Sequence, residues 1–208
     1  MEKGHTARVE RPRGRPRAFN RDDALIKAMR LFWARGYEGV TVQEVADELG
    51  INPPSLYAAF GDKRQLYRES IQRYLTGPGA YAVAALAHLD IWQAIEELLI
   101  GAVHTLTSPE TPSGCMVVLS ALNLGVNSAD IETELAGMRR HFQEAVRKRL
   151  QEAKQNGQLR PQTDVATLAR SIIVTYQGIA ISARDGESRS NLEAVVRLQL
   201  SALPIDHL

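Results

Sequence analysis

Cys115 is the side chain whose type and position are best suited to reactive chemistry. It is the single cysteine in 208 residues, and it follows Gly114 at the predicted start of a helix. Backbone N–H dipoles at a helix start lower the pKa of a thiol and favour the thiolate, which reacts with oxidants and electrophiles. Cys115 is therefore either a redox or electrophile sensor or a small apolar residue of the core, and the core interpretation is preferred.

No recurring catalytic or metal-binding motif accompanies Cys115. The sequence has no G-x-x-x-x-G-K phosphate loop, no G-x-S-x-G nucleophile motif, no H-E-x-x-H and no cysteine pair. The histidines are scattered from His5 to His207 without the spacing of metal ligands. We therefore predict no enzymatic activity, no metal site and no cofactor. A single cysteine also excludes an internal disulfide framework and suits a reducing cytoplasm.

The stretch TVQEVADELGINPPSLYAAF, residues 41–60, predicts two short helices joined by a tight turn. Thr41 and Glu44 form a capping box that begins the first helix, and Gly50 suits the left-handed position that ends it. Asn52 is a good N-cap, and Pro53 fits the first position of the second helix. This is the helix-turn-helix pattern, whose second helix enters the DNA major groove. An αα-hairpin inside a larger helical domain is the alternative, because it uses the same caps.

This stretch and its flanks resemble the DNA-binding domain of the TetR family of one-component bacterial repressors. The resemblance rests on LFWARGYEGVT (residues 31–41), ELGINPPSLYAAF (48–60) and GDKRQLY (61–67), and on Tyr57, Phe60, Lys63 and Leu66 in the order Y-x-x-F-x-x-K-x-x-L. It covers about the first third of the chain. The resemblance implies backbone contacts to DNA from Tyr57 and Lys63, and a dimer formed by the last two long helices as a four-helix bundle.

A disordered basic arm is predicted at residues 1–18, ahead of a DNA-binding domain at residues 19–76. The centre of the arm, RPRGRPR, resembles an AT-hook, whose arginines enter an A·T-rich minor groove; a solvated tail with non-specific attraction is the alternative. Residues 1–75 carry 14 Lys and Arg against 10 Asp and Glu, whereas residues 76–208 carry 11 against 14. Such asymmetry is expected when one end of a chain meets phosphates. The predicted DNA-binding residues are Arg13, Arg15, Arg17, Thr41, Asn52, Pro54, Ser55, Tyr57 and Lys63.

A second domain is predicted at residues 80–208, because Gly77-Pro78-Gly79 is the strong helix breaker in the middle of the chain. No alternating strand pattern follows it. The predicted fold class is all-α: an N-terminal three-helix helix-turn-helix domain and a C-terminal helical domain for ligand binding and dimerisation. The helices of the second domain are predicted at about 91–106, 115–124, 129–155, 165–184 and 191–203.

The helix predicted at residues 165–184 is apolar around most of its circumference and must be buried on several sides. We predict that it packs, with the final helix, against a second copy of the chain; an intramolecular core is the alternative. A symmetric dimer presents two recognition helices, so its operator is expected to be a pseudo-palindrome. The predicted dimerisation residues are Ile172, Ile173, Ile179, Val195 and Val196.

Apolar side chains mixed with a few polar ones from residue 91 onward predict a small-molecule cavity, with simple core filling as the alternative. The predicted ligand-binding residues are Trp92, His104, Cys115, Asn123, Phe142 and Tyr176. The chain is thus predicted to be a cytoplasmic DNA-binding repressor that a small-molecule inducer releases from its operator. No membrane segment is expected, since no apolar run approaches ~18 residues. The alternatives are a repressor that senses thiol chemistry at Cys115, and a helical enzyme or ligand carrier whose helix-turn-helix is only scaffold.

Overall fold

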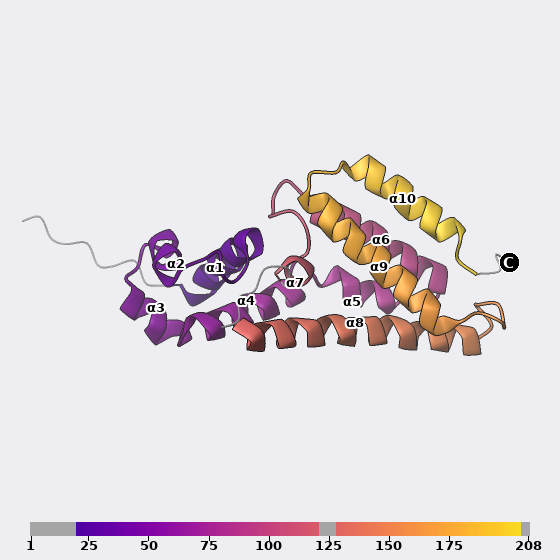
Figure 1. Cartoon of the computed structure of the whole chain (residues 1–208), viewed down its shortest axis with the longest axis horizontal. Coiled ribbons are helices and arrows are strands. Elements are labelled where there is room, and N and C mark those ends of the chain that lie inside the picture. The colour runs from indigo at the N-terminus through magenta and orange to yellow at the C-terminus, as the bar shows by residue number, and fades with distance from the viewer. Residues whose placement is uncertain (1–19, 121–127, 205–208) are drawn as a thin grey trace, which may run out of the picture.

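A computed structural model describes residues 20–120 and 128–204, and these residues form ten α-helices with no strand among them. The all-α prediction is confirmed. The molecule is elongated, with α1 (Arg21–Arg35), α2 (Val42–Leu49) and α3 (Pro53–Phe60) gathered at one end as the head (Figure 1). The fourth helix, α4 (Lys63–Thr76), runs from the head into the body, where α8 (Ala129–Gln155) continues along the same side of the molecule.

The helices of the head begin and end where their capping residues predict. Thr41 and Glu44 form the complete capping box, and Gly50 ends α2 in the left-handed conformation, with φ 66° and ψ 32°. The side chain of Asn52 accepts the N–H of Ser55 at 2.9 Å, so that α3 begins directly after the turn. Asn20 caps α1 in the same way. The predicted helix-turn-helix is confirmed.

An aromatic cluster holds α1 against α4. The ring of Tyr67 on α4 meets the rings of Phe32 and Tyr37 edge-on, with centroids 5.1 Å and 5.0 Å apart. Two turns of α4 further along, Tyr74 meets Trp33 in the same manner at 4.8 Å. Edge-on aromatic pairs add to the stability that apolar burial provides. The position of α4 is therefore fixed along most of its length by α1.

The head and the body share one continuous core and several polar links. The buried indole N–H of Trp33 donates to the carbonyl oxygen of Gly114 at 2.7 Å. Arg68 on α4 holds Glu134 on α8 through two nitrogens, at 2.6 Å and 3.0 Å. Arg184 also donates to the carbonyl oxygen of Ala34. The head and the body are therefore connected at several separate points.

The body is built from α5 (Tyr81–Leu86), α6 (Ile91–Leu106), α7 (Met116–Leu119), α8, α9 (Val165–Arg184) and α10 (Arg189–Ser201). The helix breaker predicted at residues 77–79 lies between α4 and α5, a helix that was not predicted. The helix predicted at residues 115–124 is described only as α7, since its remainder lies outside the described residues. α10 begins two residues earlier than predicted because Ser188, rather than a later residue, is its N-cap.

α9 is the central helix of the body, and it packs against α6, α7, α8 and α10. Its length and composition would also allow it to cross a membrane, a property that the core helices of soluble proteins share. In this structure its apolar residues Ile172, Ile179 and Ala180 lie in the interior of the protein. The expectation that no segment of the chain reaches this length of apolar sequence is thus corrected, although the packing of α9 is that of a core helix.

Candidate DNA-binding surface and ligand cavity

The outward face of α3 is the candidate DNA-binding surface. Leu56 and Phe60, four residues apart, are both 3% exposed and fix α3 to the rest of the head. Pro54, Ser55 and Tyr57 point away from that core, and the side chain of Tyr57 is 48% exposed. These three predicted residues are therefore free to meet a DNA groove, which is how a recognition helix is used.

Two other predicted DNA-binding residues serve mainly to build the helix ends. The hydroxyl of Thr41 accepts the N–H of Glu44 at 3.2 Å and donates to the Glu44 carboxylate at 2.8 Å. The side-chain oxygen of Asn52 accepts the N–H of Ser55. Both residues are exposed, but the Thr41 hydroxyl and the Asn52 side-chain oxygen are engaged in capping. Arg13, Arg15 and Arg17 lie outside the described residues.

Lys63 lies at the first position of α4, with its ammonium 4.2 Å from the centre of the Tyr37 ring. This cation–π contact holds the lysine side chain against the head. Burial lowers the pKa of Lys63, while the carboxylates of Glu38 and Glu44 act in the opposite direction. A phosphate that approached Lys63 would meet an ammonium whose position is already restrained. Arg21 was not among the predicted DNA-binding residues, yet it also lies next to α3. Its guanidinium donates to the carbonyl oxygen of Ala59 near the end of that helix.

A cavity of about 780 Å³ lies in the body. This volume is within the range of small-molecule sites. Side chains of α4, α5, α8 and α9, together with the start of α7, form its wall. The residues that carry most of the apolar surface are Tyr74, Leu75, Ala82, Val83, Leu86, Val117, Val118, Met138, Phe142, Ala145, Ile173 and Tyr176.

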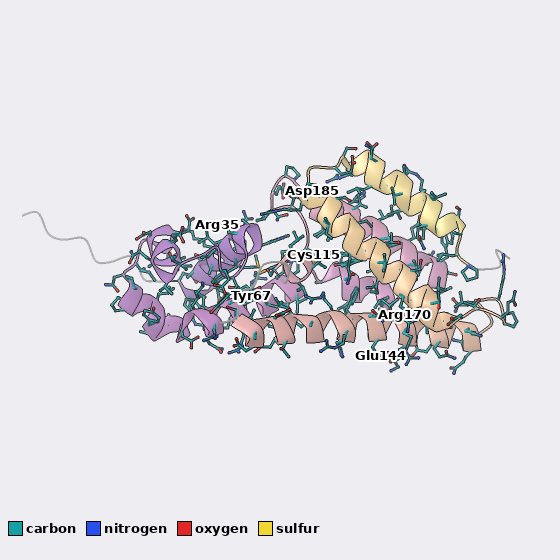
Figure 2. All side chains as sticks on the ribbon, in the orientation of Figure 1. Arg35, Tyr67, Cys115, Glu144, Arg170 and Asp185 are labelled. Carbon is teal, nitrogen blue, oxygen red and sulfur yellow. The ribbon has the colours of Figure 1, made fainter. Side chains whose placement is uncertain are left out.

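Hydroxyl groups and the thiol meet at one end of this cavity. The hydroxyls of Tyr81 and Tyr176 lie 3.0 Å apart, and that of Tyr176 lies 3.9 Å from the sulfur of Cys115. Tyr74 is 1% exposed, and its hydroxyl has no hydrogen-bond partner within the part of the chain that the structure describes. Burial raises the pKa of Tyr74, Tyr81 and Tyr176 above the usual value for tyrosine. All three phenols are therefore protonated at neutral pH and can act as donors. Figure 2 shows Cys115 at the centre of the molecule, where the head meets the body.

The structure brings Cys115, Phe142 and Tyr176 together in the cavity wall, and their role in ligand binding stays a prediction. Trp92 is not part of that wall, and His104 lies on an outer surface, where its Nε2 is 3.0 Å from the Glu193 carboxylate. His104 and Trp92 are therefore removed from the candidate site. Asn123 lies outside the described residues. Sequence analysis missed Arg139 and Tyr74. The 3.6-residue spacing of Met138, Phe142 and Ala145 on α8 is the signal that would have identified that face of α8 as a cavity wall.

Four of the five predicted dimerisation residues lie inside a single protomer. Ile172, Ile173, Ile179 and Val196 are 5% exposed or less, and they pack against other helices of the same chain. Val195 is 52% exposed, and its role in dimerisation stays a prediction. The period of an apolar helix shows which side chains are buried but does not show whether a neighbouring helix or a second chain buries them.

A capped helix-turn-helix that is fused to a helical body with an internal cavity is the architecture of a one-component transcription regulator. The chain matches two family models: "Bacterial regulatory proteins, tetR family" over residues 25–69, and "Tetracyclin repressor-like, C-terminal domain" over residues 92–198. It belongs to the TetR family of DNA-binding transcription regulators, whose members are not enzymes.

Several proteins of this family are similar to the chain over nearly its whole length. The transcriptional repressor ComR of Escherichia coli (strain K12) is 32% identical over 206 residues, which are 98% of each protein. The solved structure of a cysteine mutant of the regulator CifR with operator DNA is 39% identical, with a TM-score of 0.86, over 91% of this chain and 100% of CifR. A putative regulator from Rhodococcus sp. RHA1 is 34% identical, with a TM-score of 0.61, over 88% and 99%.

Proposed function

We propose that this protein is a cytoplasmic homodimeric repressor that binds a pseudo-palindromic operator through α3. A small molecule that binds in the body cavity releases the repressor from this operator. The observation that carries the proposal is the outward face of α3, where Pro54, Ser55 and Tyr57 stand exposed on a helix anchored by Leu56 and Phe60. The similar CifR structures are complexes with a 26-base-pair double-stranded operator. A helical enzyme or ligand carrier has no need for such an exposed helix face.

The first test selects DNA fragments from the protein's own genome and measures affinity for them as salt is varied. Neutralisation of phosphates by Lys and Arg makes the logarithm of the affinity fall linearly with the logarithm of the salt concentration. A scaffold helix-turn-helix would select no fragment and would show no salt-dependent binding to duplex DNA. This outcome would favour the carrier or enzyme alternative.

Lys63→Ala is expected to weaken binding by a similar factor on every DNA sequence and to reduce the salt slope by about one unit. The reason is that a lysine held against Tyr37 can offer its charge to the phosphate backbone but reads no base. Fluorescence anisotropy of labelled operator at several salt concentrations measures both effects. Lys27→Ala is the matched control, because the Lys27 ammonium donates to the carbonyl of Glu48 on the neighbouring helix. An unchanged slope in Lys63→Ala would remove Lys63 from the DNA-binding surface.

The outward faces of α9 and α10 provide the surface for a second copy. Val174 and Ile181 on α9 are 67% and 42% exposed, and their spacing of seven residues places them on one side of the helix. Val195 and Leu198 on α10 are 52% and 73% exposed, and they also share one face. The two helices contact each other, so these side chains form one apolar surface, here named the α9–α10 face. Apolar patches of this kind mark interaction sites.

Ligand binding is coupled to DNA binding through α4 and Gly114. Tyr74 and Leu75, near the end of α4, line the cavity, and Lys63 lies at the other end of the same helix. Gly114 accepts the indole N–H of Trp33 in the head, and the next residue, Cys115, lines the cavity. The dimer has one conformation that fits the operator and one that does not. An inducer releases DNA only if its affinity for the second conformation is higher than its affinity for the first. A ligand that displaces Tyr74 or Cys115 acts on the head directly.

Thiol sensing is the second candidate function, because the sulfur of Cys115 lies in the cavity wall beside Tyr176. Cys115 is 3% exposed, so a reagent reaches it only through the cavity. The test is Cys115→Ser, followed by operator release under an oxidant, an electrophile and a panel of small apolar ligands. Release by a ligand in both proteins supports the cavity as an inducer site. If only an oxidant or an electrophile releases the operator, and Cys115→Ser abolishes that release, the protein is a thiol sensor and the inducer hypothesis is wrong.

A further inference from the structure

Arg139 is a positive charge in the wall of a largely apolar cavity, and no carboxylate of the described residues forms an ion pair with it. It lies on α8, and its Nη1 donates to the carbonyl oxygen of Val117 at 3.2 Å. No residue in the ranges 20–120 and 128–204 forms an ion pair with it. Burial lowers the pKa of Arg139, and the charge of Arg140 adds to this effect. The guanidinium has five N–H donors, so those not engaged by Val117 can serve an acceptor that enters the cavity.

The other charged residues of the cavity wall are placed differently. The guanidinium of Arg149 is engaged by the carbonyl oxygens of His88 and Leu89, at 2.8 Å and 2.6 Å, and so ties α8 to the segment before α6. Lys148 is exposed to solvent at the rim. Glu152 follows Arg139 by nearly four turns of α8, which separates the two by roughly 20 Å along the helix. Arg139 is therefore a cation of the cavity wall whose guanidinium bonds to one carbonyl oxygen and to no carboxylate in the described ranges, although the charge of Glu132 acts on it from further away.

Neutral donors accompany Arg139 at the same end of the cavity. Cys115 is close enough to Arg139 for the two groups to interact electrostatically. The hydroxyl of Tyr74 is buried close to Cys115 and to the backbone of Met116. An anion in this part of the cavity would accept hydrogen bonds from the Arg139 guanidinium. Charge-assisted hydrogen bonds of this kind are stronger than neutral ones.

The remainder of the wall is suited to an apolar body. Met138, Phe142 and Ala145 follow one another along α8 at spacings of four and three residues, and Leu86 of α5 faces the same cavity. We propose that the cavity binds an anionic amphiphile, with a carboxylate at Arg139 and an alkyl or aryl body along α8. This inference rests on the proposed function in that the same cavity is the inducer site. A neutral ligand would leave Arg139 unpaired, and a cationic one would be repelled by Arg139 and Lys148.

The test is calorimetric titration of the full-length protein with decanoate and 4-phenylbutyrate, and with decan-1-ol as a neutral ligand of similar body. Wild-type protein is expected to bind at least one carboxylate saturably and at least about tenfold more tightly than decan-1-ol. Arg139→Gln should weaken carboxylate binding by about tenfold to a hundredfold, the range for a hydrogen bond to a charged group, and should leave decan-1-ol binding unchanged. Arg140→Gln is the matched control, since Arg140 is exposed on the next position of α8 and lines no part of the cavity.

Three results would overturn the inference: no saturable binding of either carboxylate, equal affinity for decanoate and decan-1-ol, or full carboxylate affinity in Arg139→Gln. Arg139→Lys, which retains the charge, should recover part of the lost affinity; recovery separates a lost charge from a disturbed fold. A carboxylate affinity that falls in Lys148→Gln instead would move the anion to the rim and overturn the role of Arg139. Operator binding in the absence of ligand is measured separately, since its failure contradicts the proposed function and leaves the carboxylate site standing.

Discussion

Leu198→Glu is expected to convert the dimer into monomers and to reduce operator affinity by at least a hundredfold. Leu198 is 73% exposed in the protomer, so glutamate at this position leaves the fold of the single chain intact. In the proposed dimer the same position is covered by the partner, and the two-fold axis brings in two such charges. An uncompensated charge in a buried interface costs about 3–5 kcal/mol. Because each factor of ten in affinity corresponds to about 1.4 kcal/mol, this cost exceeds a hundredfold.

Sedimentation equilibrium measures the dimer, and fluorescence anisotropy of a labelled operator measures DNA binding. Leu89→Glu is the matched control, because Leu89 is 90% exposed in the segment before α6 and lies away from the α9–α10 face. It should leave both measurements unchanged. Val174→Glu, on the neighbouring helix of the same face, should reproduce the effect of Leu198→Glu. A stable dimer with full operator affinity in both variants would show that another surface makes the dimer.

The head of the protein could be predicted from the sequence because its determinants are local. Three signals set the helix ends here: the capping box of Thr41 and Glu44, the left-handed Gly50 and the N-cap Asn52. Each of them bonds to atoms no more than four residues away. The hydrogen-bond partners of these residues are close neighbours in the sequence, so the partners in the folded head can be predicted from the sequence alone. Both ends of α2 and the start of α3 follow from these residues with little help from the rest of the chain.

The cavity could be predicted only in part because its walls come from helices distant in sequence. The predicted residues Cys115, Phe142 and Tyr176 meet because α8 and α9 fold back on each other, whereas His104 has equally suitable chemistry but faces α10. Arg139 lies in a helix rich in charged residues, and nothing in the sequence distinguishes it from the arginines of that helix that face solvent. Helical period assigns such a residue to a face, and only packing shows what that face meets.

The dimer surface illustrates the same limit with apolar residues. Ile172 and Ile173 are adjacent on α9, and both are buried within the protomer. Their neighbour Val174 is the residue that points outward. A helix that is apolar around most of its circumference offers several candidate faces, and the sequence contains no mark that distinguishes the face left for a partner. The positions of α6, α8 and α10 around α9 make that distinction.

Gly114→Ala is expected to lower the free energy of unfolding by about 2–5 kcal/mol. Gly114 has φ 80°, in the left-handed region that costs a residue with a Cβ about 1–2 kcal/mol. A Cβ at this position would also lie 2.8 Å from the carbonyl oxygen of Ala180 and would overlap the side chain of Leu119. Forcing an extra methyl group into a packed site costs about 1–3 kcal/mol. Since the Ala180 oxygen belongs to the backbone of α9, it cannot move aside as the end of a flexible side chain would.

Urea unfolding measures this loss, and Gly157→Ala separates its two components. Gly157 has φ 74°, close to that of Gly114, but an added Cβ there meets no atom within 4 Å. Its substitution should therefore show the conformational cost alone, about 1–2 kcal/mol. The additional loss in Gly114→Ala measures the contact with α9, and it should be accompanied by weaker operator binding, because the Gly114 carbonyl holds the indole N–H of Trp33 in the head. Equal losses in the two variants would show that α9 yields to the methyl group, and would remove Gly114 as a rigid link between the cavity and the DNA-binding head.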